Sequence, residues 1–272
     1  MTRVVITGAT GFLGRHVVAQ LSGGFELVPV SRGQHTGVVQ VANYADVPDG
    51  DLLIHLAEEP DRAAASRAGD AHVEASTGLV RALSRRFADR MIYASSGVVY
   101  GDAGAAPFCV GDPLVSADAY TRAKILGEVE VLEAGGTVVR LANLFGPGMS
   151  KGNVMSDILR QIPGEGPLFV RDDTPVRDFL AVDDAARFFT LLAGARAHGV
   201  LNVGSGVGTR IRALAETALA LYGEIGREIV ATRPALCPSV NVLNVEQAAK
   251  VLGWAPSRSL AEHMSAYFFG KS

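Results

Sequence analysis

A run of three spaced glycines near the start of the chain constrains its fold more than any other feature. Gly8, Gly11 and Gly14 stand in "TGATGFLG", between the β-branched run "RVVI" and a segment whose apolar residues have helical spacing. At a strand-to-helix junction the first glycine allows the tight turn, the second lets a pyrophosphate approach the backbone, and the third lets the helix pack on the strand. Unpaired N–H groups at the start of the helix then face the anion. The stretch predicts a dinucleotide-binding turn.

Apolar strands and amphipathic helices alternate after this turn, as in a parallel sheet that is covered on both faces. We expect strands over 26–30, 38–41, 51–57, 90–95 and 137–146, helices over 66–87 and 118–134, and in the last third helices over 183–195, 209–222, 244–252 and 259–268. The pattern predicts an α/β fold with a Rossmann-type doubly wound parallel sheet and a smaller C-terminal substrate-binding lobe. We assign residues 1–165 and parts of 178–206 to the dinucleotide-binding domain, and residues 166–272 mainly to the lobe.

Composition and charge exclude several classes of protein. The chain has 272 residues, 48% of them hydrophobic, and a net charge of −3. It contains no apolar run of the roughly 18 residues that a membrane span needs, no apolar leader before a cleavage site, and no basic stripe interleaved with aromatics. We therefore expect a cytoplasmic protein that binds neither membrane nor nucleic acid. Cys109 and Cys237 lack CxxC spacing and there is no HExxH motif, so we expect no disulfide framework and no metal.

A second motif, "YTRAK", places Tyr120 and Lys124 four residues apart in a segment without proline. On a helix both side chains emerge from one face and can approach the same ligand. A phenol is a poor base at neutral pH, but a nearby ammonium and an oxidised nicotinamide both favour its anion. Tyr120 could then move a proton to or from a sugar oxygen while hydride moves to or from the nicotinamide. The same spacing also arises by chance on many helices. The pair therefore indicates a catalytic site only in combination with the other motifs of the chain.

These motifs, together with "SSGVVYG", resemble the extended short-chain dehydrogenase/reductase family, the NAD(P)-dependent sugar-nucleotide epimerases, dehydratases and reductases. The resemblance runs over nearly the whole chain, since "TGATGFLG", "LLIHLA", "SSGVVYG", "YTRAK", "RLANLFGPG", "VRDFLAVDDAA", "LNVGSG" and "LGWAP" occur in the family's order. It implies a nucleotide-sugar substrate and a catalytic trio of Ser96, Tyr120 and Lys124, in which Ser96 binds the reacting sugar oxygen and Lys124 holds the nicotinamide ribose. The cofactor contacts that it implies are Gly8, Thr10, Gly11, Phe12, Leu13, Gly14, Ser31, Arg32, Leu56, Ala57, Tyr120 and Lys124.

The resemblance also implies substrate contacts and an assembly. Asn143 in "RLAN" and Arg177 in "VRDF" match residues that contact the substrate diphosphate and the nucleotide phosphates, and a planar guanidinium suits phosphate because it meets two oxygens at once. Family members often form a dimer through the two helices that match 66–87 and 118–134. We expect a homodimer, although the apolar residues of the second helix could instead face the sheet; they are Ile125, Leu126, Val129 and Leu132.

Departures from the family pattern indicate which of the family's reactions this chain is expected to catalyse. Gly97 and Val98 follow the matched Ser96 where dehydratases carry Asp-Glu, so we do not expect elimination of water. After the second strand, "VPVSRG" offers Ser31 and Arg32 to a 2′-phosphate where NAD-preferring members place an acid, and the alternative is an exposed arginine in a turn.

We therefore expect NADP(H) to be preferred, with NAD(H) possible. The predicted activity is reduction of the 4-keto group of a nucleotide-activated deoxysugar, with Tyr120 as proton donor. An NAD(P)-dependent 4-epimerase is the alternative, followed by a cofactor-sensing protein without turnover. The sequence leaves open the sugar, the nucleotide, the product stereochemistry, and the roles of His72 and of Glu58 in "AEEP".

Overall fold

Within the described residues, seven parallel strands form the central sheet, and their order places the switch point of the fold beside β1. The computed structural model describes residues 1–59, 61–103, 107–195, 197–235, 237 and 239–270. The strand order is β10-β6-β5-β4-β1-β2-β3. The bounds are β1 (Arg3–Thr7), β2 (Glu26–Ser31), β3 (Val39–Gln40), β4 (Leu52–His55), β5 (Met91–Ser96), β6 (Thr137–Leu141) and β10 (Gly199–Val203). The chain adds β2 and β3 on one side of β1 and returns through β4 to the other side, so the predicted Rossmann-type sheet is confirmed.

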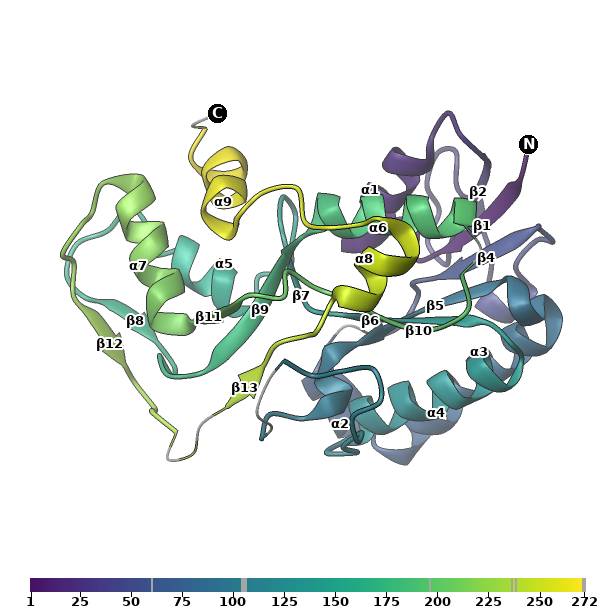
Figure 1. Cartoon of the computed structure of the whole chain (residues 1–272), viewed down its shortest axis with the longest axis horizontal. Coiled ribbons are helices and arrows are strands. Elements are labelled where there is room, and N and C mark those ends of the chain that lie inside the picture. The colour runs from purple at the N-terminus through teal and green to yellow at the C-terminus, as the bar shows by residue number, and fades with distance from the viewer. Residues whose placement is uncertain (60, 104–106, 196, 236, 238, 271–272) are drawn as a thin grey trace.

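Helices cover both faces of this sheet, because successive residues of each buried strand point to opposite faces. In β1, Val4 and Ile6 belong to the apolar cluster shared with α1, α6 and α8, whereas Val5 belongs to the cluster shared with α3 and α4. Figure 1 shows α1, α6 and α8 on one side of the sheet and α3 and α4 on the other. The bounds are α1 (Phe12–Leu21), α2 (Arg62–Ala68), α3 (Asp70–Phe87), α4 (Ala119–Glu133), α6 (Val182–Ala195) and α8 (Glu246–Leu252). In the described ranges, no helix combines the length and hydropathy that a membrane crossing requires.

The smaller lobe, which lies to the left in Figure 1, has an apolar cluster of its own. In this lobe β9 (Val176–Ala181) pairs with β7 (Asn143–Phe145), β11 (Gly208–Arg210) and β13 (Val240–Asn241), and β8 (Leu168–Val170) pairs with β12 (Ile229–Ala231). Its helices are α5 (Val154–Leu159), α7 (Ile211–Tyr222) and α9 (Leu260–Phe268). Short 3-10 helices are η1 (Tyr44–Asp46), η2 (Ala88–Arg90) and η3 (Gly97–Tyr100).

Two expected elements are divided in the structure. The helix predicted over 66–87 is broken at Gly69, whose φ of 59° is a left-handed conformation that glycine tolerates, and the two parts are α2 and α3. The strand predicted over 137–146 ends its part in the central sheet at β6, because the N–H of Ala142 still bonds to Val203 of β10 at 2.9 Å but the next residue pairs with β9. The chain thereby passes from the large sheet to the lobe within two residues of the predicted substrate contact Asn143.

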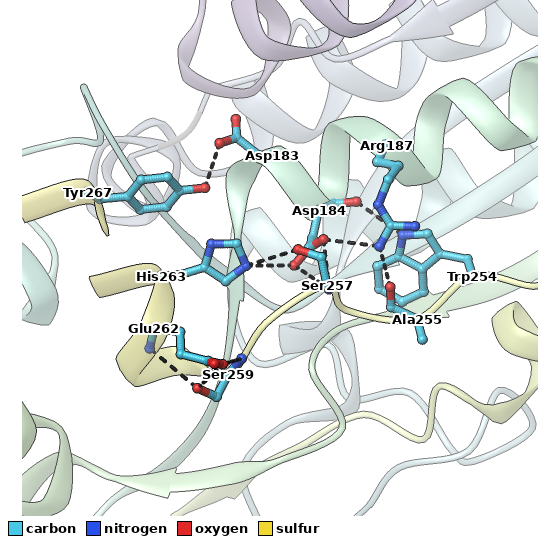
Figure 2. A network of polar contacts seen from close by, with 10 residues as sticks. All are labelled: Asp183, Asp184, Arg187, Trp254, Ala255, Ser257, Ser259, Glu262, His263 and Tyr267. Atoms are coloured by element: carbon cyan, nitrogen blue, oxygen red, sulfur yellow. Dashed lines mark hydrogen bonds and ion pairs between the residues drawn. The ribbon is translucent and has the colours of Figure 1, made fainter. Parts of the chain in front are cut away.

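A network of polar contacts fixes α9 to α6, one of the helices that cover the central sheet (Figure 2). Both carboxylate oxygens of Asp184, at the start of α6, accept the N–H of Ser257 at 3.0 Å, and one of them lies 2.9 Å from Nε2 of His263 in α9. The indole N–H of Trp254 donates to the carbonyl of Asp184 at 3.2 Å. Burial alone would raise the pKa of Asp184, but the donors to its carboxylate, Ser257, Arg187 and His263, hold the pKa below its usual value. The ionised Asp184 therefore fixes the angle at which the C-terminal segment returns to α6.

Candidate active site

The backbone is closely packed at the glycine turn, where β1 passes into α1. Gly8 has a φ of 67°, and a Cβ at this position would lie 3.0 Å from the backbone of Leu56 and Ala57. A Cβ on Gly14 would lie 2.0 Å from the carbonyl oxygen of Gly8, so only glycine lets the first turn of α1 pack this closely. Gly11 caps α1 with no side-chain hydrogen bond to the first turn, which leaves the N–H groups there free of a competing side-chain oxygen. This geometry fits the pyrophosphate of a dinucleotide.

The two residues expected at a 2′-phosphate lie in different surroundings at the end of β2. Ser31 is buried, and its Oγ lies 3.2 Å from the hydroxyl of Thr10 and accepts the N–H of Gly33 at 3.1 Å. Arg32 is exposed and lies with its guanidinium 5.6 Å from the ring centroid of Tyr44. It lines a cavity of about 500 Å³ that Glu74 of α3 also lines. Ser31 therefore fixes the turn, whereas Arg32 of the β2 end and Glu74 of α3 bring opposite charges to the cavity.

Tyr120 and Lys124 lie together on α4, as their spacing predicts. The side chain of Lys124 is 8% exposed, and its Nζ donates to the carbonyl oxygen of Ala94 in β5 at 2.7 Å. The same Nζ lies 5.9 Å from the ring centroid of Tyr120 and 4.9 Å from that of Tyr93. The ammonium is thus held against the sheet, beside the phenol that would exchange a proton.

Sequence reasoning missed the partner of Lys124, which is Glu58. The two side chains form a buried ion pair, and the carboxylate of Glu58 also accepts hydrogen bonds from the hydroxyls of Tyr93 at 2.7 Å and Ser76 at 3.0 Å. Burial alone would raise the pKa of Glu58, but Lys124 holds it below its usual value. Burial would likewise lower the pKa of Lys124, and Glu58 instead raises it above its usual value. The available signal was the carboxylate of "AEEP", at a position where the family usually has a smaller residue.

Ser96 ends β5 at the expected place beside α4. Its hydroxyl accepts the N–H of Val98 at 3.4 Å and so caps η3, and α4 packs against both β5 and η3. This packing places Ser96 beside the helix that carries Tyr120.

Buried charges beneath this loop explain the other polar residues of "SSGVVYG". The hydroxyl of Ser95 donates to Glu128, whose carboxylate also binds Arg140 at 2.6 Å, and these two charged side chains are 2% and 5% exposed. Arg140 donates to the hydroxyl of Tyr100 at 2.7 Å, and that hydroxyl donates to Asn202 at 2.8 Å. Ser95 and Tyr100 fix the two ends of the loop, which leaves Ser96 between them.

The predicted substrate contacts lie where the sheet meets the lobe. Asn143 is exposed, and its amide donates to the carbonyl oxygen of Asp178 at 3.1 Å. Arg177 is 22% exposed and already donates to Asp102 at 3.1 Å and to the hydroxyl of Ser239 at 2.6 Å. A phosphate that binds Arg177 must therefore replace or share these partners.

His55 is a core residue of β4. Its Nδ1 lies 2.8 Å from the hydroxyl of Thr7, and its ring stacks on Tyr93 with the centroids 6.0 Å apart. The hydroxyl of Thr7 also accepts the N–H of Leu56 at 3.2 Å, and Nε2 of His55 has no hydrogen-bond partner within the described structure. Burial lowers the pKa of His55 to about 4. Among the described side chains, no cluster of three or more His, Cys, Asp or Glu is placed to hold a metal.

Known proteins resemble this chain over most of its length. The model of the NAD dependent epimerase/dehydratase family matches residues 4–204. The chain is 30% identical to GDP-6-deoxy-D-mannose reductase of Pseudomonas aeruginosa over 253 residues, which cover 84% of this chain and 82% of that protein. It is 26% identical to UDP-glucose 4-epimerase of Streptomyces lividans over 310 residues, with coverage of 94% and 92%.

The solved structures agree on the fold. RMD from Pseudomonas aeruginosa, complexed with NADPH, superposes with a TM-score of 0.85 at 24% identity and covers 98% of this chain and 97% of its own. The family match, the glycine turn and the paired Tyr120 and Lys124 point to one conclusion. This chain is an enzyme of the NAD dependent epimerase/dehydratase family, within the nucleotide-sugar reductases and epimerases that its motifs resemble.

Proposed function

We propose that this enzyme uses NADPH to reduce the 4-keto group of a nucleotide-activated deoxysugar. The observation that carries the proposal is the end of β2, where Ser31 occupies the turn and Arg32 lines the adjacent cavity, at the place where NAD-preferring members of the family carry an acid. An arginine there favours a cofactor with a 2′-phosphate. The similarity to GDP-6-deoxy-D-mannose reductase, and the NADPH bound to the structural relative, support the same reading.

In this proposal Tyr120, Ser96 and Lys124 have different roles in the reaction. Tyr120 donates its phenolic proton to the ketone oxygen as hydride reaches the carbonyl carbon, so that the ketone becomes an alcohol. Ser96 donates a hydrogen bond to the same oxygen while negative charge develops on it. The bound nicotinamide supplies the hydride. Lys124 keeps one N–H for the nicotinamide ribose after bonding to Ala94 and Glu58, because an ammonium has three donors.

A 4-epimerase is the second candidate, since the same trio serves both reactions and the epimerase of Streptomyces lividans matches 94% of the chain. The two activities differ in stoichiometry. An epimerase oxidises and re-reduces the sugar with one retained cofactor, whereas a reductase exchanges cofactor at every turnover. With a nucleotide-bound 4-keto-6-deoxysugar, this enzyme should consume one NADPH per product. A saturated nucleotide sugar without added cofactor should give no stereoisomer; its interconversion without net change in NADPH would replace the reductase with the epimerase.

The substrate is proposed to bind between the large sheet and the lobe, which we assign mainly to residues 166–272. Asn143 and Arg177 lie on the strands that connect the two parts, β7 and β9. We propose that they contact the phosphates of the nucleotide sugar. A lysine at position 177 would keep the charge but lose the fork, so Arg177→Lys should raise the KM for the nucleotide sugar and leave NADPH binding unchanged.

We also propose a homodimer that uses the outer face of α4. Ile125 packs toward the core, but Leu126, Val129 and Leu132 are 40%, 45% and 37% exposed, so the apolar stripe of α4 is divided between the core and the surface. Light scattering at micromolar concentration should give the mass of a dimer for the wild type and of a monomer for Val129→Arg. Val251→Arg is the matched control, since Val251 is 49% exposed on α8, across the sheet. A monomeric wild type would refute the assembly.

A further inference from the structure

The ion pair between Glu58 and Lys124 is assigned no role in the reaction proposed above, which involves Lys124 but not Glu58. Glu58 follows β4 at the carboxyl end of the sheet, and Lys124 reaches it from α4. Their side chains are 13% and 8% exposed, so the carboxylate and the ammonium are both largely removed from water. Separating two such charges is costly, because either one would be left buried without a counter-ion.

The surroundings fix the carboxylate more firmly than an ion pair alone would. Tyr93 of β5 and Ser76 of α3 donate to the same oxygen of Glu58, and the other oxygen binds Lys124. Burial and the neighbouring carboxylate raise the pKa of Tyr93 well above its usual value, so this hydroxyl stays a donor. Glu58 is thus held by groups from three elements, and its position in turn determines where the ammonium lies.

The remaining groups around Lys124 cannot replace this counter-charge. Tyr120 and Glu128 face it electrostatically from its own helix, and His55 faces the pair from β4. Glu128 is already bound by Arg140 through contacts of 2.6, 3.0 and 3.1 Å. His55 and Tyr120 carry no negative charge as neutral side chains. Glu58 is therefore the anion that compensates Lys124.

We propose that Glu58 is a positioning residue that keeps Lys124 charged and fixed beside Tyr120, with one N–H left for the nicotinamide ribose. The assignment rests on the proposed function only for its catalytic consequence, because the ion pair itself is a property of the free protein. Without Glu58 the buried ammonium would release its proton more easily. Lys124 would then neither hold the ribose with a charge-assisted hydrogen bond nor bring positive charge to Tyr120.

Lysine NMR on the free protein tests this directly. The sequence has lysines only at positions 124, 151, 250 and 271, so the ¹³Cε signal of Lys124 in ¹³C-lysine-labelled protein can be assigned by its absence from Lys124→Arg. In Glu58→Gln, which keeps the shape of the side chain and removes its charge, the titration midpoint of Lys124 should fall by at least about one pH unit, a tenfold loss of proton affinity. The titration midpoints of the other lysines should be the same in Glu58→Gln and in the wild type.

Glu59→Gln is the matched control. Glu59 is the next residue of the same loop and is exposed, so this variant makes the same charge change without touching Lys124 and should titrate like the wild type. An unchanged Lys124 midpoint in Glu58→Gln, or an equal shift in Glu59→Gln, would overturn the assignment. If Glu58→Gln does not fold, Glu58→Gln/Lys124→Met should fold, because it removes the unpaired charge as well; failure of both variants would also overturn it.

The catalytic consequence has its own readout. In Glu58→Gln, the alkaline limb of kcat/KM for ketone reduction should move to lower pH, whereas a general loss of packing would lower the rate equally at every pH. Absence of any reductase activity in the wild type would refute the proposed function and leave the NMR result to decide the role of Glu58.

Discussion

Stability at mildly acidic pH tests the description of His55. The side chain is fully buried in β4, and its pKa of about 4 lies below the value of about 6.5 that an exposed histidine has in an unfolded chain. Between these values the unfolded state binds a proton that the folded state does not. The contribution of His55 is therefore complete above about pH 6.5 and is lost as the pH falls toward about 4. A difference of about 2.5 pH units, at ~1.4 kcal/mol each, amounts to about 3–4 kcal/mol.

Urea unfolding at a series of pH values between 4.5 and 7.5 measures this dependence. The free energy of unfolding of the wild type should fall toward acid, and His55→Phe should show a shallower fall, because phenylalanine keeps a ring against Tyr93 but does not titrate. The variant loses the hydrogen bond to Thr7 at every pH, so the comparison uses the slope and not the absolute free energy. His35→Gln, which changes an exposed histidine, should keep the slope of the wild type. Parallel curves for wild type and His55→Phe would refute the reasoning.

Other variants test the site and its support. Tyr120→Phe should lose most turnover with nearly unchanged cofactor binding, since its hydroxyl acts on the transition state, whereas Ser96→Ala should lose less, about 10²-fold; wild-type rates in Tyr120→Phe would contradict the assignment. Arg32→Ala should weaken NADPH far more than NADH in direct titrations, because only NADPH loses a charge-assisted contact, and tighter binding of NADH by the wild type would contradict it. Glu128→Gln leaves Arg140 buried without its counter-ion and should lower the free energy of unfolding by about 3–5 kcal/mol in urea, so a loss under about 1 kcal/mol would show that the pair is not buried in solution.

Features that depend on neighbouring residues could be predicted from the sequence. The turn at Gly8 and Gly14 and the pairing of Tyr120 with Lys124 need only a strand, a helix and a fixed spacing. The alternation of strands and helices likewise identifies the fold, because each element must bury one face. The break at Gly69 was missed because the helical spacing of apolar residues continues through it, and only the φ of 59° reveals it.

Contacts between residues far apart in the chain could not be predicted. Glu58 meets Lys124 only because β4 and β5 are neighbours in the sheet and α4 packs against β5. The sequence marks Glu58 as unusual but gives it no partner. Arg140 and Glu128 are nearer in sequence, but nothing in their spacing shows that both are buried beneath the Ser96 loop. Tertiary packing, and not local preference, decides these pairs.

Transfer of label from the cofactor is the most direct test of the proposed reduction. With NADPH that carries deuterium at both positions of nicotinamide C4, and a nucleotide-bound 4-keto-6-deoxysugar, mass spectrometry of the product should show one deuterium per molecule, placed by NMR at sugar C4. Tyr120→Phe should form this product far more slowly with the same labelling. Unlabelled product, or a saturated nucleotide sugar that inverts at C4 and keeps its own hydrogen, would contradict the reductase assignment.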